Sequence, residues 1–269
     1  MQKNPDDSLP DGEHRPLPVM DRTIFHFASA LTKLSSEGSE PAFAPTTRFE
    51  NESFKIRLVS NNERRKSAVL LVEKLYGSRG YKASNEAAAP EEKPDRITLL
   101  VNNKENRPVG TITLGPDGPM GLMADELYKD ELDAMRAKPG VRLLELTKLA
   151  MDRHSGNVRE VLAHLFNIVY IYTKVLECNW MVIEVNPRHV GFYESSLGFK
   201  VLGAERICPR VNAPAVLLGL DLKYMAEQIK KFSSNKNVRE AGKSLYRYSL
   251  SKKDELGLVK RLLEGDVHE

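Results

Sequence analysis

A regular hydrophobic pattern begins near residue 54. In the segment SFKIRLVS, apolar and basic residues alternate from Phe54 to Leu58, which predicts a half-buried strand. A helix is expected next, in AVLLVEKLY, with its end at Gly77. Residues 97–101 and 109–114 then predict a hairpin around the turn NNKENRP.

The later elements complete the pattern of one layered domain. DELYKDELDAMRA predicts a helix with one apolar side, and VRLLELTKLAMD is apolar enough for a central strand. The long helix expected over residues 157–179 is apolar over most of its circumference, so it should lie buried against the sheet. Strand WMVIEV, helix PRHVGFYESSL and strands FKVLGAERI and AVLLGLDL follow. This order predicts an α+β fold, with helices against one mixed, mostly antiparallel sheet that has a local parallel pair.

A short helix is predicted between the strands WMVIEV and FKVLGAERI. Asn186 suits the N-cap, Pro187 suits the first helical position, and Gly198 suits a left-handed C-terminal stop. This helix would return Tyr193 to the side of the strand that it follows. The Tyr193 hydroxyl then has two interpretations, a bond to a backbone carbonyl in the core or a proton donor at a cleft.

Length and composition indicate one sizeable domain with appendages. The chain has 269 residues, 41% hydrophobic and 29% charged. Residues 1–50 are rich in proline and are expected to be mostly disordered, apart from a short amphipathic helix near residues 22–34. The folded domain is expected over residues 51–232, with a basic helical or loose tail over residues 233–269.

Composition also bears on location and partners. No apolar run is long enough for a transmembrane helix and no secretory leader is evident, so a cytoplasmic location is expected, with peripheral membrane contact left open. Cys178 and Cys208 lack the spacing of a zinc site, and no metal is expected. Residues 223–261 hold eleven Lys or Arg against four Asp or Glu, which is typical of a solvated face or of a surface for an acidic partner. Aromatic residues do not interleave with these charges, so nucleic acid is not an expected partner.

Four segments in this order resemble a known family: DELYKDELDAMR, LLELTKLAMD, EVNPRHVGFYESSLGFKVLGAER and CPRVNAPAVLLGLDL. They are similar to N-acyl amino acid synthases of the FeeM type, within the GNAT acyltransferase superfamily, over about residues 53–230. The resemblance implies a bacterial enzyme of lipid biosynthesis that moves a long acyl chain from a phosphopantetheine thioester to the α-amine of an amino acid. It also implies a V-shaped acyl-thioester cleft between the central strands.

The resemblance suggests catalytic residues. Glu145 begins the central strand, where many GNAT enzymes place a base, and burial among leucines would raise its pKa toward neutrality. Tyr193 matches the tyrosine that protonates the leaving sulfur. Glu184 is the rival base, and the alternative for Glu145 is a partner for Lys148 or Arg142 on the sheet.

The same resemblance suggests how the donor is held. Backbone amides of Leu149, Ala150 and Met151 are expected to contact the thioester arm. The turn that follows, DRHSGNVREVL, contains only Gly156 where coenzyme A enzymes carry several glycines. Acyl carrier protein, with one phosphate held by Arg153, His154 and Gly156, is therefore the expected donor and partner, with acyl-coenzyme A the less favoured one. No permanently bound cofactor is expected.

An amino-acid acceptor needs a cation for its carboxylate, and arginine binds a carboxylate with two parallel hydrogen bonds. The expected acceptor residues are Glu184, Asn186, Arg188, Arg206 and Asn212. Arg210 is a further candidate cation. Each of these residues has an alternative interpretation as a surface charge or a turn residue.

Three other functions remain open on the sequence. The first is synthesis of signals like acyl-homoserine lactones, and the second is transfer of a short acyl group from coenzyme A. The third is a noncatalytic module that binds acyl chains or acyl carrier protein. The acceptor amino acid and the acyl length are not predicted.

Overall fold

The computed structural model describes most of the domain predicted over residues 51–232 and part of the chain that follows. The described residues are 49–51, 54–59, 62–78, 80–81, 96–152, 157–234, 242–253 and 255–256. The helix predicted near residues 22–34 lies outside them, as does much of the tail predicted over residues 233–269. The domain limits therefore stay predictions.

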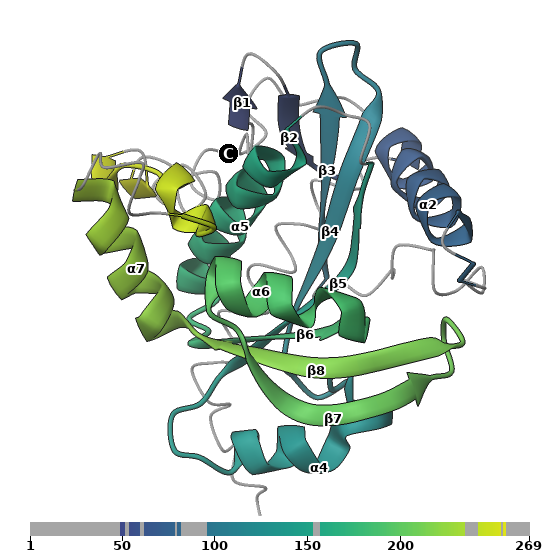
Figure 1. Ribbon diagram of the computed structural model, residues 1–269, viewed down its shortest axis with the longest axis vertical. Helices are drawn as coiled ribbons and strands as arrows, with labels where there is room; N and C mark the ends of the chain where they lie inside the picture. The colour runs from purple at the N-terminus through teal and green to yellow at the C-terminus, as the bar shows by residue number, and fades with distance from the viewer. Residues whose placement is uncertain are drawn as a thin grey trace, which may run out of the picture.

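The core of the fold is one eight-stranded sheet with the order β1-β2-β3-β4-β5-β6-β8-β7 (Figure 1). The only parallel pair among these strands is β5 with β6, and every other neighbouring pair is antiparallel. This confirms the predicted mixed, mostly antiparallel sheet with a local parallel pair. The strands are β1 (Phe49–Asn51), β2 (Phe54–Leu58), β3 (Ile97–Asn103), β4 (Pro108–Pro116), β5 (Leu143–Met151), β6 (Trp180–Val185), β7 (Lys200–Cys208) and β8 (Ala213–Asp221).

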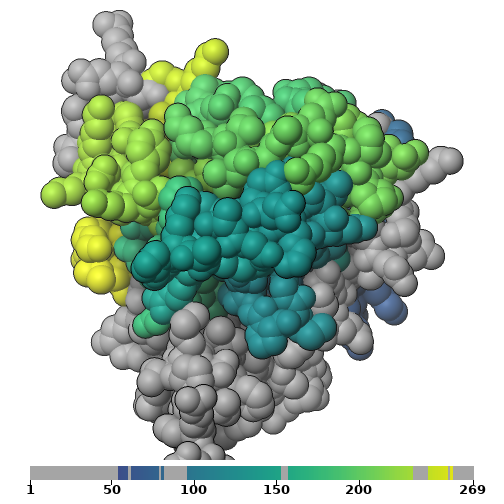
Figure 2. All heavy atoms as spheres, turned by 90° about the horizontal axis from the view of Figure 1, so that it is seen from below, coloured from purple at the N-terminus to yellow at the C-terminus, as the bar shows by residue number. Residues whose placement is uncertain are grey.

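Helices pack on both faces of the sheet. The helical elements are α2 (Asn62–Gly77), α4 (Asp125–Arg136), α5 (Val158–Val175), η1 (Pro187–His189), α6 (Val190–Leu197), α7 (Leu222–Ser234) and η2 (Leu245–Tyr248). The largest hydrophobic cluster joins one sheet face to α5, α6, α7 and η2. Two smaller clusters place α4 and α2 on the opposite face. In Figure 2 the teal surface around α4 lies directly against the green surface of β7 and β8, in agreement with the contacts between α4 and β7.

Side chains alternate between the two faces of the sheet along each strand, so every second residue meets the same face. On β6, Met181, Ile183 and Val185 pack with the α5 cluster, whereas Val182 packs with α4. Side chains of a strand alternate between faces, so Glu184 points to the same side as Val182. The sheet therefore carries Glu184 on its α4 face.

The predicted corner after β6 forms as expected. The Asn186 side chain accepts a hydrogen bond from the N–H of Arg188, and Pro187 begins the short 3₁₀ turn η1 that leads into α6. Gly198 ends α6 with φ +82°, and its N–H donates to the Glu194 carbonyl over 3.0 Å. A side chain at Gly198 would collide with the ring of Tyr224, so this position needs glycine for space as well as for conformation.

No helix among the described residues is long and apolar enough to cross a membrane.

Candidate active site

The parallel strands β5 and β6 part in the middle of the sheet. Their pairing runs from Leu143 opposite Trp180 to Leu146 opposite Ile183 and stops there. The pairs Thr111–Ala150 and Thr113–Thr147 enclose one more residue on β5 than on β4, which is a β-bulge. Lys148 lies in it with φ +51°, a left-handed conformation that is uncommon for a lysine. The bulge bends β5, and an opening follows the last β5–β6 pair.

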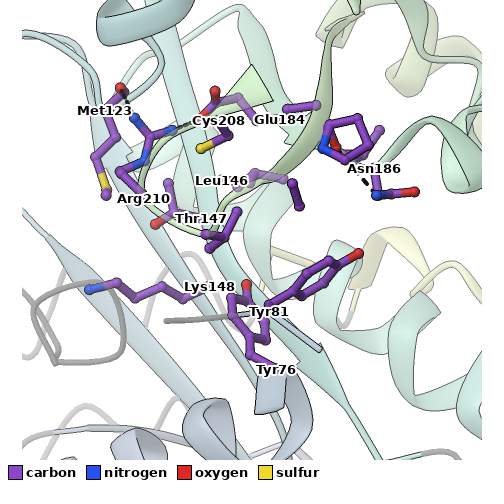
Figure 3. Close-up of a pocket in the computed structure, with 15 residues that line it drawn as sticks. Tyr76, Tyr81, Met123, Leu146, Thr147, Lys148, Glu184, Asn186, Cys208 and Arg210 are labelled. Atoms are coloured by element: carbon purple, nitrogen blue, oxygen red, sulfur yellow. Dashed lines mark hydrogen bonds and ion pairs between the residues drawn. The ribbon is translucent and has the colours of Figure 1, made fainter. Parts of the chain in front are cut away.

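Two adjoining cavities, of about 150 and 110 Å³, occupy this opening, and Figure 3 shows the first of them. Eight residues line both of them: Tyr76, Tyr81, Leu146, Thr147, Lys148, Glu184, Val185 and Asn186. The first cavity continues toward the turn between β7 and β8, where Arg210 lines it, and the second continues to α6, where Tyr193 lines it. The cavities together thus connect groups from both faces of the sheet.

Glu184 is the carboxylate that lines both cavities. Its side chain is 13% exposed, and one oxygen pairs with the Arg210 guanidinium. The other oxygen, Oε1, is buried and has no hydrogen-bond partner among the described residues. Burial raises the pKa of Glu184 to about 7, against the opposing charge of Arg210 and with help from the charges of Glu145 and Glu126. A carboxylate with this pKa is suited to take and release a proton near neutral pH.

Arg210 holds three acceptors around the first cavity. Its Nη1 donates to the Met123 carbonyl over 3.0 Å and pairs with Glu126, while its Nη2 pairs with Glu184. Figure 3 shows Met123, Arg210 and Glu184 together on one side of the cavity, with Tyr76 and Tyr81 on the other. The guanidinium is therefore a half-buried cation at the wall of the cavity.

Glu145, the predicted base, lies behind this wall and lines neither cavity. Its two oxygens accept hydrogen bonds from the backbone N–H groups of Met123 (2.7 Å) and Ala124 (2.8 Å), at the start of α4. Arg96 lies 4.0 Å from Oε2. Burial raises the pKa of Glu145, and the N–H groups and Arg96 oppose that rise. The catalytic role of Glu145 stays a prediction, and its contacts support a structural role more directly.

Tyr193 lies where the predicted corner puts it, on α6 and beside the second cavity. It is 8% exposed, and its ring packs edge-on against Phe192 and Phe199, with ring centroids 5.4 and 5.7 Å away. These contacts fix the ring plane. Glu184 and Tyr193 therefore line one cavity from two elements, β6 and α6.

Of the residues predicted to hold the donor, Leu149 lines the second cavity. Ala150 is buried in the cluster beneath α2, and Met151 packs over Gly110, where a Cβ would approach the Met151 sulfur to 2.5 Å. The backbones of Ala150 and Met151 pair with strand β4 in the sheet. Arg153, His154 and Gly156 lie outside the described residues.

The predicted acceptor residues separate into two groups. Glu184 and Asn186 line both cavities. Arg188 lies outside the lining, but its Nη2 donates to the hydroxyl of Tyr81 over 2.8 Å, and Tyr81 does line them. The structure does not bring Arg206 or Asn212 to the cavities.

Arg206 and Asn212 have structural surroundings instead. Arg206 pairs with Glu131 over 2.6 Å, and its guanidinium lies 4.7 Å from the ring centroid of Tyr128 on α4. Asn212 adopts φ +48° in the turn between β7 and β8, whereas its neighbours Val211 and Ala213 line the first cavity.

Several lining residues were not predicted as site residues: Tyr76, Tyr81, Met123, Thr147, Lys148 and Cys208. Tyr76 stands near the end of α2, and Met123 precedes α4. Nothing in the local pattern distinguishes these residues from ordinary core or surface positions. Their place at the cavities depends on how α2 and α4 pack on the sheet.

Comparisons with known proteins agree with the fold. Residues 67–221 match the family model described as N-acyl amino acid synthase FeeM. The solved structure of FeeM, an N-acyl amino acid synthase from uncultured soil microbes, is 31% identical, with a TM-score of 0.59, and the match covers 67% of this chain and 95% of that chain. A search of curated proteins gave no match.

Two more distant structures have TM-scores below 0.5. A putative N-acetyltransferase from Lactobacillus plantarum is 14% identical at a TM-score of 0.46, over 63% of this chain and 99% of that one. The acyl-homoserine lactone synthase LasI is 13% identical at a TM-score of 0.46, over 63% and 89%. The family match spans more than half of the chain, and the chain accordingly belongs to the FeeM family of N-acyl amino acid synthases, acyltransferases with the GNAT fold.

Proposed function

We propose that this protein transfers a long acyl group from the phosphopantetheine thioester of acyl carrier protein to the α-amine of an amino acid. The observation that carries the proposal is Glu184, a half-buried carboxylate with a pKa of about 7 at the opening between β5 and β6. Family membership supplies the reaction class. A cytoplasmic location is part of the proposal, because the carrier and the amino acid must both reach the enzyme.

In the proposed reaction, Glu184 removes a proton from the ammonium group of the bound amino acid. The amine nitrogen then attacks the thioester carbonyl, so that a C–N bond forms and the C–S bond breaks. The tetrahedral nitrogen gives up its second proton to solvent as the C–S bond breaks. The departing thiolate takes a proton from the Tyr193 hydroxyl, solvent restores that proton, and Glu184 releases its own proton to solvent. Acid and base assistance of this kind contributes about 10²–10⁴-fold.

The two catalytic groups approach the opening from opposite faces of the sheet. Glu184 belongs to the α4 face, and Tyr193 comes from α6, which packs on the other face. An amine on one side and a thioester on the other would meet between the parted strands. This placement supports a direct attack of the amine on the thioester, in which proximity supplies much of the rate.

The choice of acyl carrier protein over coenzyme A rests on the sequence. The turn after β5 offers a single glycine, Gly156, for phosphate binding. A carrier presents one phosphate and an acidic surface, which suits the basic residues 223–261. Charge reversal of four of these basic residues should weaken carrier binding at low salt.

The experiment is a donor and acceptor matrix with purified protein. Acyl carrier protein and coenzyme A carry the same long acyl chain, and each is mixed with the twenty amino acids or with S-adenosylmethionine. Mass spectrometry should find acyl amides of one or a few amino acids, formed faster from the carrier. Turnover of S-adenosylmethionine would identify a lactone synthase, and faster transfer from coenzyme A would reject the carrier.

A further inference from the structure

The Glu184–Arg210 ion pair carries an inference that rests on the proposed function and deepens it. We propose that Glu184 occupies, in the resting protein, the place on Arg210 that the α-carboxylate of the acceptor takes. A free amino acid would then displace Glu184 from Arg210 and release it to act as the base. Binding of the α-carboxylate therefore switches on the base.

The geometry of Arg210 permits such an exchange. Arg210 is 19% exposed at its side chain and lines the first cavity, so an acceptor in the cavity can reach the guanidinium. Glu184 accepts from Nη2 through one oxygen only, while Nη1 is held by Met123 and Glu126. Arginine binds carboxylates best through two parallel hydrogen bonds. Glu184 therefore does not make the two parallel hydrogen bonds to Arg210 that the carboxylate of a free amino acid could make.

Charge balance favours replacement of one carboxylate by another over simple opening of the pair. An ion taken out of water that loses its partner is strongly destabilised. If the α-carboxylate of the acceptor takes the place of Glu184, Arg210 keeps a partner throughout. The α-ammonium group of the same molecule then faces the displaced Glu184 carboxylate. A free amino acid carries both charges that this exchange requires.

The exchange would also change the basicity of Glu184. Arg210 is the neighbour that lowers the pKa of Glu184, whereas burial and the charges of Glu145 and Glu126 raise it. Once the guanidinium has turned to the acceptor, the carboxylate takes a proton more readily from the ammonium group. Acceptors without the carboxylate would leave Glu184 on Arg210 and find a weaker base.

The test compares one amino acid with its α-amide as acceptors, at a fixed long-chain donor. The wild-type protein should prefer the free acid by about 100-fold or more in kcat/KM, because a site built for a polar partner rejects the analogue that lacks it. In Arg210→Gln the preference for the acid should be lost: kcat/KM for the acid should fall to the level of the amide, whereas the amide rate should not fall, because the variant removes the neighbour that weakens the base. Arg210→Lys should recover part of the preference for the acid, since lysine keeps the positive charge but cannot donate the two parallel hydrogen bonds of a guanidinium.

The amide is an internal control for folding, because a misfolded variant would lose activity with both acceptors alike. Arg142→Gln is a matched control for the loss of an arginine ion pair, since Arg142 pairs with Glu177 away from the cavities. It should retain the full preference for the acid. The inference is overturned if wild-type protein uses the amide as well as the acid, or if Arg210→Gln loses activity with both acceptors in equal measure while its circular dichroism and thermal unfolding match those of the wild type. Failure of the proposed function has another signature, in which wild-type protein acylates neither acceptor.

Discussion

Glu145 is joined to Met123 by a hydrogen bond of 2.7 Å from the Met123 N–H to Glu145 Oε2. A second bond of 2.8 Å, from the N–H of Ala124, engages the other carboxylate oxygen. The first N–H groups of a helix have no partner within the helix and carry its positive end, so a carboxylate is well placed there. Since the Met123 carbonyl in turn accepts from Arg210, Glu145 positions the loop that holds the cavity cation.

Removal of the Glu145 charge should therefore lower stability. In Glu145→Gln the amide NH₂ group would face a backbone N–H, which leaves a buried donor without its acceptor. We expect the free energy of unfolding to fall by about 1–3 kcal/mol. Urea unfolding measures it, with Glu177→Gln as the control because Glu177 is 59% exposed in its pair with Arg142. An equally small loss in both variants would contradict the structural role.

Activity should depend on the ionisation of Glu184. The base acts when deprotonated, so kcat/KM should rise about tenfold per pH unit below pH 7 and level off above the pKa of about 7. Glu184→Gln should lose about 10²–10⁴-fold in kcat, and its pH profile should lose the acidic limb, which is the rise of kcat/KM below pH 7. Glu145→Gln should keep the limb. If the limb disappeared in Glu145→Gln and survived in Glu184→Gln, the two carboxylates would have the opposite roles.

Tyr193→Phe should affect the departure of the thiol. The ring contacts with Phe192 and Phe199 are retained, so thermal stability should change little. With the natural thioester, kcat should fall by about 10²-fold or more. The deficit should shrink with a donor whose thiol is more acidic, because that leaving group needs less protonation. A deficit that is the same for both donors would argue against Tyr193 as the acid.

Gly203 should be intolerant of a side chain. A Cβ there would lie 2.5 Å from Cδ1 of Tyr128, a fully buried ring whose hydroxyl donates to the Ala215 carbonyl over 2.6 Å. The ring is fixed at both ends, so Gly203→Ala should cost about 1–3 kcal/mol of unfolding free energy. Gly191→Ala is the control: a Cβ there meets nothing within 4 Å in the described structure, and the helix should gain about 0.5–1 kcal/mol. Equal effects of the two substitutions in calorimetry would contradict this packing.

Local patterns were sufficient for the sheet and for the corner after β6. Alternation placed β2, and the apolar segments placed β5, β6 and α5, because each pattern depends only on neighbouring residues. The stop at Gly198 could be predicted for the same reason, since a left-handed residue after a helix is a local requirement. The bulge at Lys148 could not, because lysine carries no signal for positive φ.

The proposal of Glu184 over Glu145 as the base depends on the tertiary structure. Both are single carboxylates in apolar strands, and both point to the α4 face. What separates them are partners far along the chain, the N–H groups of α4 for one and Arg210 after β7 for the other. The same holds for the arginines: Arg206 and Arg210 are four residues apart, and only Arg210 reaches the cavity.

The central claim is that a carboxylate on β6 drives acyl transfer to an amino acid. The most direct measurement is mass spectrometry of products formed by wild-type, Glu184→Gln and Glu145→Gln proteins from long-chain acyl carrier protein and a mixture of amino acids. The account predicts an amide-linked acyl amino acid from the wild type and from Glu145→Gln, and at least a hundredfold less from Glu184→Gln. Undiminished product from Glu184→Gln, or no acyl amino acid from the wild-type protein, would contradict it.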